Sequence, residues 1–73
     1  ELKQAAVHYQ TALDLHQLEP RMEASLLNAL ADTLLELGNY GEAAGLIKRS
    51  LAQFERQYAA YYLQYRLARL QQD

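Results

Sequence analysis

The chain has 73 residues, a size that allows one small domain or a piece of a larger protein. It contains no cysteine, which excludes disulfides and thiolate metal sites, and its net charge of −2 argues against the basic excess that nucleic-acid binding needs. No apolar run approaches the ~20 residues that cross a bilayer, and no signal peptide is visible. We therefore expect a cytoplasmic protein that binds neither nucleic acid nor membrane. With 51% hydrophobic residues but only three glycines and one proline, the composition is typical of an all-α protein.

Helix-breaking residues are so few that they divide the chain into four predicted helices. Pro20 suits the first turn of a helix, where its missing N–H costs nothing. Gly38 suits the left-handed position that ends a helix, and Asn39 suits the cap of the next one. Residues 53–60 contain no glycine or proline, so a continuous helix there is an alternative to a break near residues 55–58. We favour the break and predict helices at 2–16, 20–37, 40–55 and 58–72.

Each predicted helix carries an apolar stripe at helical spacing, and the short connections imply antiparallel neighbours. The stripes are Leu2, Ala5, Ala6, Tyr9, Ala12 and Leu13 in the first helix, Leu27, Leu30, Ala31, Leu34 and Leu37 in the second, Ala43, Ile47, Ser50, Leu51 and Phe54 in the third, and Ala59, Leu63, Leu67 and Leu70 in the fourth. We expect these stripes to form one core that includes Leu30, Leu34, Ile47, Leu51 and Leu63.

The helices also repeat in pairs. The first predicted helix aligns with the third at an offset of 38, which places Ala5 on Ala43. The second aligns with the fourth at an offset of 37, which places Leu26 on Leu63 and Leu30 on Leu67. Because a two-helix unit that recurs at such a period cannot bury its apolar face alone, the pattern indicates an α-solenoid segment.

The most regular part of this pattern resembles a tetratricopeptide repeat. The residues that carry the resemblance are Leu27, Leu30, Ala31, Leu34, Gly38, Tyr40, Ala43, Ile47, Ser50 and Leu51. The long period is similar to that of the kinesin light chain type and of bacterial regulators with such arrays. The resemblance implies one full repeat at 24–57, the second helix of a preceding repeat at 2–16 and the first helix of the next at 58–73. It also implies a protein–protein interaction module.

No residue pattern indicates catalysis, so we expect no enzymatic activity, cofactor or metal. His8 and His16 lie two turns apart, too far to share one ion, and no HExxH motif is present. The three glycines lack the strand and the Lys-Ser/Thr that a phosphate loop requires. The carboxylate pair Asp32/Glu36, like Glu19/Glu23, is interpreted as a solvated helix face.

The candidate binding surface follows from the repeat register and from a tyrosine stripe on the fourth helix, opposite its leucines. Such a stripe serves either packing or recognition, and Tyr and Arg are the side chains that carry most energy at interfaces. By the 37-residue offset, three fourth-helix residues are the counterparts of three second-helix residues on the concave face of the repeat. The predicted protein-binding residues are Ser25, Asn28, Asp32, Tyr62, Tyr65 and Arg69.

Two functions compete at this point. The first is binding of a peptide or protein segment in the groove, which predicts that Tyr62 and Tyr65 are exposed. The second is an architectural or self-association role in a multidomain regulator, which predicts that they are buried against neighbouring repeats. We also expect the isolated chain to associate end to end, because solenoid ends without polar caps expose apolar strips. The expected strips include Leu2, Ala5, Tyr9 and Ala12 at one end, and Tyr61, Leu67, Ala68 and Leu70 at the other.

Overall fold

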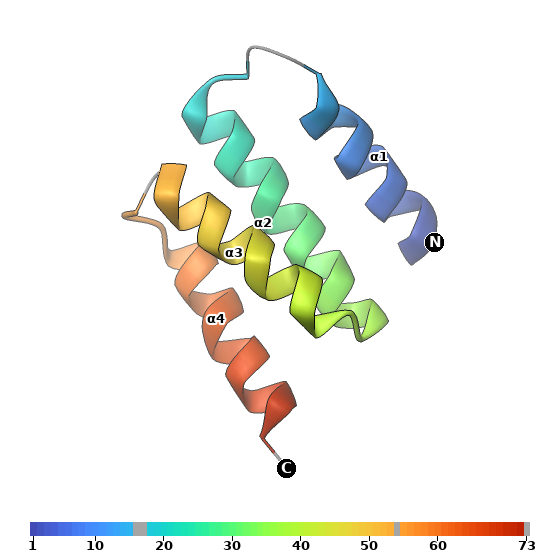
Figure 1. Ribbon diagram of the computed structural model, residues 1–73, viewed down its shortest axis with the longest axis vertical. Coiled ribbons are helices and arrows are strands. Elements are labelled where there is room, and N and C mark those ends of the chain that lie inside the picture. The colour runs from blue at the N-terminus through green and yellow to red at the C-terminus, as the bar shows by residue number, and fades with distance from the viewer. Residues whose placement is uncertain (16–17, 54, 73) are drawn as a thin grey trace.

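The structure, a computed structural model, describes residues 1–15, 18–53 and 55–72. Within these ranges the chain forms four α-helices and no strand. They are α1 (Leu2–Asp14), α2 (Pro20–Leu37), α3 (Tyr40–Gln53) and α4 (Tyr58–Gln71). The all-α class and the four helices are thus confirmed. Figure 1 shows that successive helices run in opposite directions and that α1 and α4 lie at opposite edges of the molecule.

The helix ends follow from local chemistry at the residues that interrupt the pattern. Pro20 is the first residue of α2, after Glu19 in an extended conformation. Gly38 ends α2 in the left-handed region with a φ of 84°, as predicted. Its N–H donates to the carbonyl of Leu35 at 3.1 Å, and the N–H of Asn39 donates to the carbonyl of Leu34 at 2.8 Å. These bonds satisfy carbonyls that the helix end leaves without partners.

The break between the last two helices is also confirmed. The helix α3 ends at Gln53, and α4 begins at Tyr58 after Gln57 in an extended conformation, with φ −142° and ψ 118°. No glycine or proline marks this break, so its cause lies in tertiary contacts of Gln57 that are described below. The predicted stripe residue Phe54 lies outside the described residues, as does His16.

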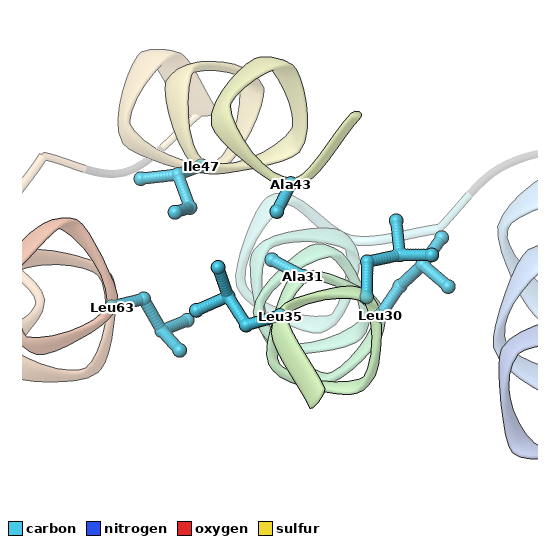
Figure 2. Close-up of a cluster of buried hydrophobic side chains, with 7 residues drawn as sticks. Leu30, Ala31, Leu35, Ala43, Ile47 and Leu63 are labelled. Atoms are coloured by element: carbon cyan, nitrogen blue, oxygen red, sulfur yellow. The ribbon is translucent and has the colours of Figure 1, made fainter. Parts of the chain in front are cut away.

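The core lies where α2 packs against the three other helices. Its buried members are Leu30, Ala31, Leu34 and Leu35 from α2, Ala43 and Ile47 from α3, and Leu63 from α4 (Figure 2). Side chains of α1 that include Ala6, Tyr9 and Leu13 pack against this cluster. Of the five expected core residues, four are buried, and Leu51 is partly buried against the cluster.

The buried surface of α2 is wider than the predicted stripe. Leu35 and Thr33 are also buried, because α2 contacts α1, α3 and α4 and is therefore covered on several sides. Thr33 satisfies its hydroxyl within the helix by donating to the carbonyl of Ala29 at 3.0 Å. A helix surrounded by three others buries more than one stripe, and the sequence pattern alone did not indicate that α2 holds this place.

Two predictions at the edges of the fold are wrong. On α4 the buried alanine is Ala60 rather than Ala59, and Leu70 is 45% exposed. On α1, Tyr9 packs against the core cluster and is therefore not part of an exposed strip. The inner face of α4 is rotated from the predicted one, because apolar residues occur on more than one side of this helix and contact with α2 selects among them. On α1 the predicted stripe residues Ala6, Tyr9 and Leu13 do pack against the core.

Candidate functional site

A groove of about 330 Å³ lies between α2 and α4. Its lining residues are Asn28, Ala29 and Asp32 from α2, and Ala59, Tyr62, Leu63 and Arg66 from α4. The groove therefore combines apolar side chains with an amide, a carboxylate, a guanidinium and an aromatic ring. Asn28 and Ala59 also line a second hollow of about 300 Å³, together with Ser25, Gln57 and Tyr58, so the two hollows are neighbours along α2.

The structure places the predicted binding residues in two groups. Asn28 and Asp32 of α2 line the groove with Tyr62 of α4, and Ser25 lines the neighbouring hollow. In contrast, Tyr65 and Arg69 line neither of the two. They contact each other on the exposed side of α4, where the Arg69 guanidinium donates to the Tyr65 hydroxyl at 2.9 Å and lies 5.7 Å from the ring centroid. The expectation that all six residues share one surface is therefore met only in part.

The misplacement has a simple geometric cause. Ala24 and Leu27 are buried in α2, and Ala60 and Leu63 are buried in α4, so the burial patterns coincide at an offset of 36 rather than 37. One residue corresponds to about 100° of rotation around a helix, since a turn takes 3.6 residues. This rotation removes Tyr65 and Arg69 from the face that looks toward α2.

Arg66 is the groove residue that sequence reasoning missed. Its guanidinium donates to a carboxylate oxygen of Asp32 and, at 3.4 Å, to one of Glu36. It also lies 5.9 Å from the centroid of the Tyr62 ring, within the range of a cation–π contact. The hydrogen bond to Asp32, together with the negative charges around it, raises the pKa of Arg66 against the opposing effect of burial. The carboxylate pair assigned to solvent thus has a cationic partner.

A sequence signal for this contact existed. Asp32 and Glu36 lie four residues apart on one helix face, as do Tyr62 and Arg66 on another, and residues at that spacing are neighbours on a helix. Two adjacent helices with such pairs favour an ion pair across their boundary.

Because Asp32 and Glu36 each remain about half exposed, the ion pairs contribute at most about 1 kcal/mol to stability. Their effect is to hold Arg66 beside Tyr62 rather than to stabilise the fold.

Gln57 positions the start of α4. Its side-chain amide donates to the carbonyl of Ser50 at 2.8 Å, and its oxygen accepts from Asn28 at 2.8 Å and lies 3.2 Å from the Ser50 hydroxyl. That hydroxyl also lies 3.3 Å from the carbonyl of Ala24. One loop side chain thereby ties α2 to α3 just before α4 begins. In the described part of the chain, the side-chain oxygen of Asn28 is buried and accepts no hydrogen bond.

A larger hollow of about 470 Å³ lies between α1 and α3, with Leu30 and Leu34 of α2 at its base. None of the predicted binding residues lines it.

Among the described residues, no three His, Asp or Glu side chains come together as metal ligands, and no helix is long and apolar enough to cross a membrane. The chain matches no protein-family model, no curated protein and no solved structure. The chemistry of the α2–α4 groove is therefore the main guide to function.

Proposed function

We propose that the chain is a tetratricopeptide-like helical repeat module that binds a peptide or protein segment in the groove between α2 and α4. The observation that carries this proposal is the lining of the groove, where Asn28 and Asp32 face the exposed ring of Tyr62 and the guanidinium of Arg66. These groups offer hydrogen-bond donors, acceptors and an aromatic surface to the main chain of a bound peptide. Tyr and Arg are also the residue types that most often dominate the energy of protein interfaces.

The repeat part of the proposal is supported by burial. Seven helical residues of the resemblance are buried, namely Leu27, Leu30, Ala31, Leu34, Ala43, Ile47 and Ser50, and Tyr40 and Leu51 are partly buried against the core. Gly38 adopts the conformation that the turn within the repeat requires. The helix α2 contacts α3, its partner within the proposed repeat, and α4, the first helix of the next repeat. Both contacts are expected when consecutive repeats lie side by side.

The exposure of the tyrosines favours recognition over a purely architectural role. Tyr62 and Tyr65 are both exposed, whereas a spacer role predicts that they are buried. The architectural alternative keeps one supporting observation, which is the exposure of apolar side chains such as Val7 and Leu70 on the edge helices.

The experiment is a selection of peptides from a random displayed library, followed by affinity measurement of the selected peptides by calorimetry at low micromolar protein. Tyr62→Ala should weaken binding by about 30-fold, since truncation of an interface anchor costs ~2 kcal/mol. Val7→Ala is the matched control, because Val7 is 63% exposed but lies on α1, away from the groove. Equal affinities for the Tyr62 variant and the control would refute the groove as the binding site, as would a library that yields no binder.

A further inference from the structure

Four of the six tyrosines form an exposed face on α4. Tyr58, Tyr61, Tyr62 and Tyr65 are 95%, 51%, 60% and 57% exposed, and their spacing puts them on the side of the helix away from the core residues Ala60 and Leu63. We call these four residues and Arg69 the tyrosine face. In Figure 1, α4 lies at the edge of the molecule opposite α1, so no helix of the described residues lies beside the outer side of α4.

The area of this face is of the size that an interface covers. A folded monomer of 8.4 kDa exposes about 4,600 Å². This chain exposes 5242 Å², which is about 600 Å² more. At the exposures given, four tyrosines account for on the order of 500 Å², since each offers ~150–250 Å². Each partner of a small specific interface buries about 600 Å², so the four tyrosines supply most of the area that one partner covers.

The order of residues along the face is self-complementary. When two copies of α4 pack antiparallel about a two-fold axis between positions 63 and 64, Tyr62 faces Tyr65 of the second copy. In the same arrangement Tyr58 faces Arg69 of the second copy. Aromatic pairs and guanidinium–aromatic pairs are both attractive contacts, and a two-fold axis makes each occur twice.

Charge selects the antiparallel arrangement over the parallel one. α4 carries Arg66 and Arg69 and no acidic residue. Arg66 is paired with Asp32 and Glu36, whereas the contacts of Arg69 in the described part of the chain are with Tyr65 alone. A parallel pair places two Arg69 guanidiniums side by side. An antiparallel pair separates them by about 16 Å along the axis, since eleven residues rise 1.5 Å each, and this exceeds the screening length of ~8 Å at physiological salt.

From the area, the residue order and the charge, we propose that the tyrosine face binds a second copy of this chain, as an antiparallel α4–α4 dimer with two-fold symmetry. The interface is distinct from the groove between α2 and α4, with Tyr62 at their shared border. The proposal does not depend on the groove binding a peptide. It also differs from end-to-end association of α4 with α1, which is heterologous and produces either a growing chain or a closed ring.

Sedimentation equilibrium from 10 µM to 1 mM tests this arrangement. The natural chain should show a monomer–dimer equilibrium with no larger species. Tyr58→Lys places a like charge opposite Arg69 and should weaken the dimer at least tenfold, whereas Tyr58→Glu places an opposite charge there and should leave it as tight or tighter. Position 58 is almost fully exposed, so neither change disturbs folding, which circular dichroism verifies.

Three results would overturn the proposal. The first is a chain that stays monomeric at 1 mM. The second is an average molar mass that keeps rising with concentration beyond that of a dimer and that is lower in Val7→Ser than in the natural chain. Val7 lies on α1, so this change should leave an α4–α4 dimer intact. The third is a dimer that responds equally to the two Tyr58 variants, because the facing of Tyr58 and Arg69 would then be wrong. None of these results bears on the affinity of peptides for the groove.

Discussion

Replacing Leu34 by alanine should remove a large part of the stability of this chain. Leu34 lies in the central helix α2, is 6% exposed, and belongs to the cluster in which α2 meets α3 and α4. Truncation of a buried leucine costs ~2–5 kcal/mol, from the lost burial of its methyl groups and from the cavity left behind. Leucine and alanine differ little in helix propensity, so the helix itself adds little to the change.

That cost is large for a chain of this size. Small domains have only ~0.05–0.15 kcal/mol of stability per residue, which gives about 4–11 kcal/mol for 73 residues. For domains of this length, 1 kcal/mol shifts the melting temperature by about 4–8 °C. A loss of ~3 kcal/mol therefore lowers the midpoint of a thermal melt by about 12–24 °C, which circular dichroism at 222 nm detects easily.

Leu70→Ala is the matched control for this measurement. Leu70 also lies in a helix, but it is 45% exposed, so its truncation should cost less than about 1 kcal/mol. The ratio of the two effects is the test, because both variants remove the same atoms. If Leu34→Ala and Leu70→Ala lowered the melting temperature equally, α2 would not be the centre of the core.

Three further predictions concern the turn, the outer surface of α3 and the groove ion pairs, and urea unfolding measures each. Gly38→Val should destabilise the chain by ~1 kcal/mol or more, because a β-branched residue is strained at a φ of 84°; an unchanged midpoint would contradict this. Gly45→Ala should stabilise it by up to ~1 kcal/mol, since a Cβ there meets open space on a helix; a loss would show an unseen contact. Arg66→Gln should change stability by less than about 1 kcal/mol, because its carboxylate partners are half exposed; a larger loss would make the pair structural.

The two ends of α2 could be predicted from sequence because their causes are local. Pro20 and Gly38 act through their own backbone preferences, which depend little on the rest of the fold. The inner faces of α2 and α3 could also be predicted, since Leu27, Ala43 and Ile47 follow a clear helical period.

The site was less predictable than the helices. The positions of Asn28 and Asp32 followed from the period of α2, and Tyr62 was placed correctly beside them. Arg66 was missed because its role depends on carboxylates some thirty residues away in the sequence, on another helix. Likewise, Gln57 has no local mark of importance, and only the folded chain brings Asn28 and Ser50 within hydrogen-bond distance of it.

The rotation of α4 was decided by tertiary structure alone. This helix carries leucine, alanine or tyrosine on nearly every side, so two registers one residue apart satisfy its periodicity almost equally well. Close packing against α2 and α3 separates them, because small Ala60 fits where the helices meet and Leu63 fills the space beside Leu35 and Ile47. Local backbone preferences thus determined where α2 begins and ends. Tertiary contacts of Gln57 set the start of α4, and the shape of the neighbouring surface determined which side of α4 faces the core and which tyrosines remain outside.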